Sequence, residues 1–150
     1  MERTGNNNHL SQFEFEGFSR GVTYLETTKI EGYPDVECDV YKFDGDDSKD
    51  LGIIRINKGG FTPLQRVNEG ERTVEGRVSG SGRFIVIRAD RTEEIYAVGG
   101  SIPFSVEVKK GDSMQWRADT DSNLVAYEVC IPPYKDGRFE NISFEELASK

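Results

Sequence analysis

The residues that could do chemistry gather between Lys58 and Gly82, where glycines and polar residues frame an alternating segment. A polar turn at 68–70 (Asn-Glu-Gly) predicts one strand on either side of it. Because side chains alternate between the two faces of a strand, one face of the second strand carries four polar residues. They are Glu71, Thr73, Glu75 and Arg77. Such a face indicates either a lined ligand pocket or a solvated sheet face, and the pattern alone leaves both open.

Metal sites and histidine chemistry find little support in the composition. The one histidine, His9, falls in the polar N-terminal segment, which disfavours histidine-based acid–base catalysis and most metal-hydrolase sites. Cys38 and Cys130 lie far apart without a CxxC spacing, so we expect two buried free thiols rather than a zinc site. The acidic segment 44–50 resembles part of a calcium loop but lacks the ligand spacing of an EF-hand. We expect it to be a solvated hairpin connection.

Length and charge narrow the class of protein. The 150 residues suffice for one domain with a sizeable core, which we place at 13–150 after a flexible tail at 1–12. The formal charge of -8 disfavours a nucleic-acid partner, because a surface that binds the phosphate backbone needs clustered lysine and arginine. No apolar run reaches the length of a membrane span, and the polar start lacks the apolar region of a secretory signal. We therefore expect a cytoplasmic protein with no membrane partner.

The hydrophobic periodicity predicts an all-β domain with about ten short strands. Aromatic residues at 13–18 predict an edge strand, and Pro132 ends the last strand because proline cannot extend a ladder. The polar run 134–141 is expected to be a surface turn. Ser143 and Glu146 have the spacing of a capping box, which predicts a short C-terminal helix. A sandwich, a barrel and a jelly roll are all consistent with this strand count.

The order of the motifs resembles the cupin family, the RmlC-like jelly rolls. The segment KGGFTPLQRV (58–67) is similar to the first cupin motif, in which a glycine precedes two histidines separated by one residue. Gln65 and Val67 stand at the two histidine positions, and the following glutamate position falls on Glu71 or Thr73.

The second cupin motif is also matched in part, by Gly111 and Asp112 at its start and by 127–133 as its closing strand. The proline and histidine of that motif are missing. The resemblance covers about residues 51–133. It implies a single-domain cupin-like double-stranded β-helix, or jelly-roll, barrel.

The departures from the family motif imply a barrel without a metal or other cofactor. Cupins commonly hold iron, manganese, nickel or zinc with imidazoles and a carboxylate. Here Gln65 offers one weak neutral oxygen, and Val67 offers no ligand atom. Even with a carboxylate from Glu71, such a set cannot hold a first-row metal firmly.

Nine residues with amide, carboxylate, hydroxyl, guanidinium or aromatic groups are predicted to line the barrel or its mouth. They are Gln65, Glu71, Thr73, Glu75, Arg77, Gln115, Trp116, Arg117 and Tyr127. Such groups suit a sugar or a small organic acid, because they pair with hydroxyls and offer an aromatic face to ring C–H groups. Core packing is the simpler interpretation of Trp116. The inward faces of 113–118 and 124–131 stay open.

These observations favour a metal-free small-molecule-binding protein. A second hypothesis is a metal-independent enzyme, resembling the sugar-nucleotide isomerase and epimerase branch of the cupins, with Glu75 and Tyr127 as acid–base pair. That role requires burial to raise the pKa of Glu75. A third is a structural or interaction barrel filled by its own side chains. A homodimer through the edge strand at 13–18 is consistent with each of them.

Overall fold

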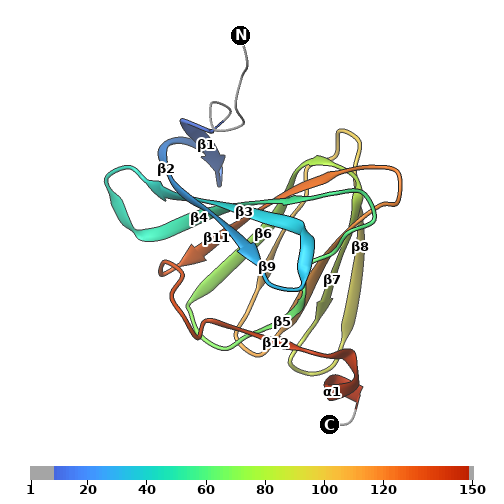
Figure 1. The fold of residues 1–150 in the computed structure, drawn as a ribbon. Coiled ribbons are helices and arrows are strands. Elements are labelled where there is room, and N and C mark those ends of the chain that lie inside the picture. The colour runs from blue at the N-terminus through green and yellow to red at the C-terminus, as the bar shows by residue number, and fades with distance from the viewer. Residues whose placement is uncertain (1–8, 149–150) are drawn as a thin grey trace.

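The computed structural model describes residues 9–148, which form twelve strands and one short helix (Figure 1). The strands form two sheets with antiparallel pairing. The seven-stranded sheet contains, in spatial order, β1 (Gln12–Phe15), β2 (Phe18–Ile30), β3 (Tyr33–Phe43), β4 (Asp46–Ile56), β11 (Leu124–Ile131), β6 (Arg72–Gly80) and β9 (Ser105–Val108). The five-stranded sheet contains β12 (Phe139–Ile142), β5 (Leu64–Val67), β10 (Ser113–Ala118), β7 (Gly82–Ile87) and β8 (Glu93–Val98).

The two sheets face each other and enclose the main core, so the predicted jelly-roll barrel is confirmed. The turn at 68–70 carries the chain from β5 in one sheet to β6 in the other. The connection from β10 to β11 crosses in the same way. Side chains from both inner faces interdigitate between the sheets, as in other double-sheet folds. The buried members of this core are Val36, Ile54, Ile56, Val67, Phe84, Val86, Val98, Val108, Met114, Trp116, Ala118, Leu124 and Ala126.

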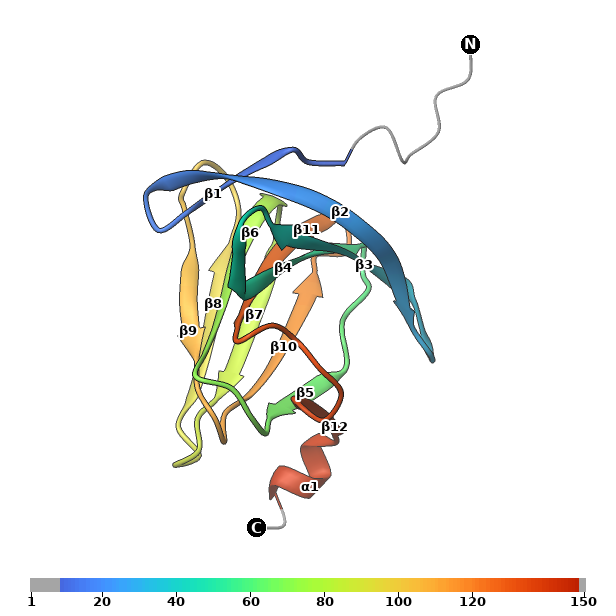
Figure 2. The same cartoon turned by 90° about the vertical axis from the view of Figure 1, so that its left-hand side faces the viewer.

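A second hydrophobic cluster lies on the outer face of the seven-stranded sheet. Strands β1 and β2 arch over this face, as the two views show (Figures 1 and 2). Phe13 and Phe15 on the edge strand β1 therefore cover the sheet as predicted. The predicted strand at 13–18 is interrupted by a turn at 16–17, and Phe18, the first residue of β2, is exposed. The buried members are Phe15, Val22, Tyr41, Phe43, Leu51, Ile53, Val74 and Val129. Part of this sheet is thus buried on both of its faces.

Two local predictions are confirmed near the C-terminus. Strand β11 ends at Ile131, directly before Pro132. The helix α1 (Phe144–Ala148) begins with the predicted capping box. The Ser143 hydroxyl accepts a bond from the Glu146 N–H at 3.0 Å, and the Ser143 N–H donates to Glu146 Oε1 at 3.1 Å.

The expectation of an acidic loop over 44–50 is wrong for most of its length, because β4 already begins at Asp46. The carboxylate of Asp46 is satisfied locally, by the Ser48 N–H at 2.9 Å and the Lys49 ammonium at 2.7 Å. This local pairing lets a charged segment run in a strand at the edge of the barrel. Only Asp44 and Gly45 form the turn.

Among residues 9–148, no helix is long and apolar enough to cross a membrane.

Candidate functional site

A hydrogen bond between two buried polar groups crosses the interior of the barrel. Trp116 on β10 belongs to the five-stranded sheet, and Glu75 on β6 belongs to the seven-stranded sheet. The indole Nε1–H of Trp116 donates to Glu75 Oε1 at 2.8 Å. The two residues are 2% and 0% exposed. Both side chains therefore point into the barrel, and the predicted inward direction of Glu75 agrees with the structure.

Glu128 on β11 stands directly opposite Glu75 in the β6–β11 register. The pKa of Glu75 is raised well above its ordinary value, chiefly because burial disfavours the charged form, and then because of the charge and hydrogen bond of Glu128. As an ionised oxygen, Glu75 Oε2 would have no hydrogen-bond partner in the described structure. A protonated Glu75 can turn this oxygen as a donor toward Glu128, its cross-strand partner. Glu75 and Glu128 are called the acid pair below.

The acid pair has a buried side and a solvent side. Glu75 is fully buried, whereas Glu128 is half-buried. Cys38 and Asp50, which are half-buried too, lie on the same inner face of the seven-stranded sheet. Burial raises the pKa of Asp50 to about 6, although the Tyr134 N–H donates to its carboxylate at 3.0 Å. Glu128 is therefore the member of the pair that solvent reaches.

The two cysteines are free thiols, as their spacing predicted. Both lie close to the acid pair. Cys130 is buried and Cys38 is half-buried. The Cys130 Sγ–H lies 3.7 Å from Glu128 Oε1 and donates to it. For both thiols, burial is the main cause that raises the pKa, and the charge of Glu128 adds to it. The thiolate forms are disfavoured, so these cysteines are not prepared as nucleophiles.

We expect native Cys38 and Cys130 to react with iodoacetamide at pH 8 about a hundredfold more slowly than in the urea-unfolded chain, because only the thiolate attacks. The measurement is alkylation followed over time by mass spectrometry of the intact chain. The unfolded protein is the matched control. Equal labelling rates in the two states would show that the thiols are not protected.

Arg138 closes one end of the barrel beside the site and is only 2% exposed. Its Nη1 donates to the Pro132 carbonyl at 2.7 Å. Its Nη2 donates to the Arg72 carbonyl at 2.7 Å, to Thr73 Oγ1 at 2.9 Å and to the Ile131 carbonyl at 3.4 Å. A single guanidinium thus ties the start of β6 to the end of β11.

The expectation that 134–141 is a surface turn is therefore wrong for its second half. β12 begins at Phe139 and pairs with β5, which draws the preceding Arg138 inward. A lone arginine after an Asp-Gly pair carries no sequence signal of burial, since its partners are backbone carbonyls. Glu128 was missed as a site residue for another reason. The alternation of side chains along this strand could be seen in the sequence, but the sequence did not decide which of the two faces of β11 points into the barrel.

The two histidine positions of the cupin resemblance lie on β5, toward the interior. Val67 is a core residue with 1% exposure, packed in the main cluster. Gln65 is half-buried and its Nε2 donates to Asn141 Oδ1 at 3.1 Å. At the glutamate position, Thr73 is buried and its hydroxyl is used by Arg138, whereas Glu71 is exposed and precedes β6.

Tyr127 lies on the opposite face of the sheet from Glu75. In the register it stands opposite Gly76, and its ring contacts the Phe13 ring at 5.0 Å within the outer cluster. The predicted acid–base pair of Glu75 and Tyr127 is therefore not assembled. Successive side chains of a strand point to opposite faces, so Glu128, the residue after Tyr127, shares a face with Glu75.

Three further predicted residues lie away from the acid pair. Gln115 is buried on the outer side of β10, and its Nε2 donates to the Thr62 carbonyl at 2.9 Å. Arg117 lies on that same outer side, and its Nη1 donates to Gln115 Oε1 at 3.1 Å. Arg77 is held by the carbonyl oxygens of Gly80 and Gly100, at 2.6 Å each. Of the nine predicted residues, the structure brings Thr73, Glu75 and Trp116 together inside the barrel, with Gln65 on an inner face near them.

A hollow of about 520 Å³ lies outside the barrel, between β2, β3, β4 and β11. Its polar groups pair with one another: Arg55 binds Asp39 through two bonds of 3.1 and 2.7 Å, and the Thr27 hydroxyl donates to Asp39 at 2.7 Å. His9 lines this hollow and stacks on the Tyr24 ring at 3.5 Å. The prediction that His9 belongs to a loose tail is thus wrong, because its ring packs against the sheet.

Within residues 9–148, no three histidine, cysteine, aspartate or glutamate side chains gather in a way that could hold a metal ion. The cupin metal positions are occupied by Val67, which has no ligand atom, by the half-buried amide of Gln65, and by the Thr73 hydroxyl, which already bonds to the Arg138 guanidinium. These groups do not fit a first-row transition metal.

Comparison with known proteins finds no matching family model and no matching curated protein. Solved structures do match over most of the chain. A cupin-2 domain protein from Rhodospirillum rubrum is 20% identical with a TM-score of 0.64, covering 94% of this chain and 86% of its own. A cupin 2 conserved barrel protein from Rhodopseudomonas palustris is 18% identical with a TM-score of 0.61, covering 87% and 82%.

Streptomyces Pac13, described as a nucleoside dehydratase and solved as a variant with uridine, is 14% identical. Its TM-score is 0.58, and the match covers 81% of this chain and 91% of Pac13. Identities this low establish a shared fold and leave activity open.

Proposed function

From the premise that this chain is a divergent protein of the cupin fold, we propose that it binds a small polar organic molecule inside its barrel. The first candidates are a sugar or a small organic acid. Binding uses the Glu75–Glu128 pair and the Trp116 indole, and it needs no metal. Aromatic side chains with a few placed polar groups are the usual surroundings of a small-molecule site.

The observation that carries this proposal is the buried acid pair joined to Trp116 across the barrel. A carboxylic acid in an apolar core costs stability unless its polar atoms are bonded. A group arranged in this way offers a ligand hydroxyl both a donor and an acceptor. The Phe84 ring adds an aromatic surface beside Trp116, and the centroids of the two rings lie 4.4 Å apart.

The resemblance to Pac13 supports a ligand with a sugar ring, because that protein is solved with uridine. A ring of this kind presents hydroxyls on its edge and C–H groups on its face. Carboxyl groups and aromatic rings satisfy these two kinds of surface respectively. In this proposal the ligand enters past the half-buried Glu128, and its hydroxyls then lie at the solvent side of the pair.

A second candidate function is acid–base catalysis without a metal, with Glu75 as proton donor and Glu128 as proton acceptor. The observation that favours it is the raised pKa of Glu75, which favours the protonated form of this buried carboxyl group. The earlier pairing with Tyr127 is replaced, because that phenol lies on the other face of the sheet. Turnover lost in Glu75→Gln with binding retained would distinguish this function from simple binding.

We expect at least one member of a panel of sugars, nucleosides and small organic acids to raise the melting temperature of the full chain, because a ligand that binds only the folded form stabilises it. Glu128→Gln and Trp116→Phe should each weaken that ligand about tenfold or more by calorimetry. Glu93→Gln, exposed on β8 of the other sheet, is the matched control and should leave the affinity unchanged. A ligand whose affinity depends on neither Glu128 nor Trp116 would rule out the interior site.

Metal analysis of protein purified without chelator tests the metal-free part of the proposal, and a stoichiometric transition metal would overturn it. The homodimer through β1 and the cytoplasmic location stay predictions. The third alternative, a barrel filled by its own side chains, is the outcome if no panel member binds.

A further inference from the structure

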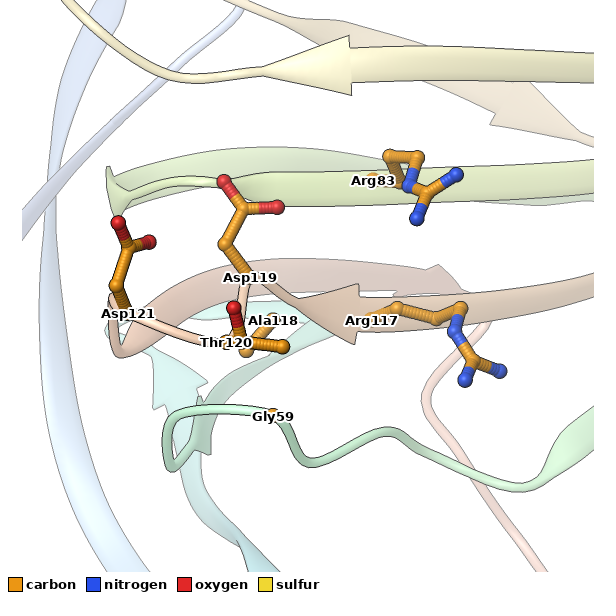
Figure 3. Close-up of a pocket in the computed structure, with 7 residues that line it drawn as sticks. All are labelled: Gly59, Arg83, Arg117, Ala118, Asp119, Thr120 and Asp121. Carbon is orange, nitrogen blue, oxygen red and sulfur yellow. The ribbon is translucent and has the colours of Figure 1, made fainter.

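Two arginines stand directly opposite each other on the outer face of the five-stranded sheet. Arg83 on β7 and Arg117 on β10 are cross-strand partners. Figure 3 shows both side chains extending from neighbouring strands toward the same side. Like charges in this relation destabilise a sheet, so the pair costs stability while nothing neutralises it.

Neither guanidinium forms an ion pair with a carboxylate in the part of the chain that the structure describes. The chain as a whole has a net charge of -8, and its acidic residues outnumber the basic ones by 27 to 19. Arg55, Arg72 and Arg88 all bind carboxylates. The two opposed guanidinium groups therefore keep donors available for an external anion.

Arg117 is held in place by neutral groups. Its guanidinium carbon lies 4.5 Å from the centre of the Phe61 ring. Its Nη1 donates to Gln115, whose amide is buried and bonded to the Thr62 carbonyl. A guanidinium fixed by an aromatic ring and a buried amide keeps its charge uncompensated, and its geometry is prepared before an anion arrives.

The pair opens on a hollow of about 280 Å³. Gly59 forms one wall, and its N–H donates to the Asp119 carbonyl at 2.9 Å, which joins this loop to the end of β10. Asp119, Thr120 and Asp121 line the other end (Figure 3). One end of the hollow is thus basic, and the other end carries two carboxylates, which accept hydrogen bonds, and one hydroxyl.

We propose that Arg83 and Arg117 form a binding site for a small organic phosphate that carries hydroxyl groups. The two guanidinium groups hold the phosphoryl oxygens, as paired arginines suit this geometry. The acidic end accepts hydrogen bonds from the ligand hydroxyls and repels a second phosphoryl group, which favours a monoester with its hydroxyls at that end. The site lies outside the barrel and is independent of the interior function.

The experiment is calorimetric titration of the full chain with glycerol 3-phosphate at low ionic strength, beside thermal unfolding at the same ligand concentrations. We expect binding and a raised melting temperature for the unmodified chain. Arg83→Gln and Arg117→Gln should each weaken binding at least tenfold, and the double variant should show no ligand-dependent shift. Without ligand, the double variant should melt no lower than the unmodified chain, because its like-charge repulsion is removed.

Lys110→Gln is the matched control, since it removes one exposed positive charge from the β9–β10 turn and should leave the affinity unchanged. Glu128→Gln should also bind normally, which separates this site from the barrel interior. The proposal fails if glycerol 3-phosphate does not bind. It fails equally if Lys110→Gln weakens binding as much as the arginine variants, because the effect would then follow net charge.

Discussion

Glu75→Gln should make the protein more stable at pH 7, although it replaces a buried residue. In the folded chain Glu75 keeps its proton, because its pKa lies well above the ordinary value. In the unfolded chain it ionises near pH 4.5. The folded state then binds more protons, so each pH unit above that value lowers the free energy of unfolding by about 1.4 kcal/mol until the folded group titrates.

A glutamine avoids this cost and keeps the contacts of the acid. Its carbonyl oxygen accepts from Trp116 Nε1, and its amide donates to Glu128. The measurement is urea unfolding at several pH values between 5 and 7, for both proteins. Asp50, whose pKa of about 6 contributes in the same direction, is present in both and cancels in the difference.

Glu93→Gln is the control for the loss of one negative charge, because Glu93 is exposed on β8. Its stability should follow the same pH dependence as the unmodified chain. A Glu75→Gln protein whose pH dependence matched the unmodified chain would show that Glu75 ionises normally when folded. The acid pair described here would then be wrong.

Arg138→Ala should lower the free energy of unfolding by about 3–5 kcal/mol, enough to unfold a marginally stable domain. The substitution leaves three backbone carbonyls and the Thr73 hydroxyl without their shared donor. It also removes a cation whose charge lowers the pKa of Glu75 and of Asp50. Equilibrium unfolding in urea at constant pH measures the loss.

Arg138→Lys keeps the positive charge but not the planar fork, and should recover only part of the lost stability. Lys135→Ala, three residues earlier and exposed, is the surface control and should change stability by less than about 0.5 kcal/mol. A small effect of Arg138→Ala would mean that water replaces the guanidinium, and that this end of the barrel is open.

The strands and the helix could be predicted because their determinants are local, whereas the jelly-roll topology was predicted from the resemblance to the cupin family. Alternating strands, Pro132 after the last strand and the Ser143 capping box each act within a few residues. The inward direction of Glu75 also followed from alternation. Its partner did not, because both faces of β11 carry residues fit for burial.

That ambiguity has a structural cause. The outer face of β11 is covered by β1 and β2, so Val129 and Tyr127 are packed there while Ala126 is buried on the inner face. A strand covered on both faces loses the polar-out pattern that would identify its interior. Long-range pairing of this kind is decided by which strands meet. Arg138 was missed because its partners are mainly backbone carbonyls, which carry no sequence signal.

The bond from Trp116 to Glu75 also makes the tryptophan a fluorescent probe of the acid pair. Trp116 is the chain's single tryptophan, and its indole N–H points at one member of the acid pair. Emission excited at wavelengths that tryptophan absorbs and the six tyrosines do not therefore originates from one place only. A change of charge or an arriving ligand there alters the field at the ring. Emission spectra recorded without any label would follow events at the centre of the barrel, while binding at the outer arginines would leave them unaltered.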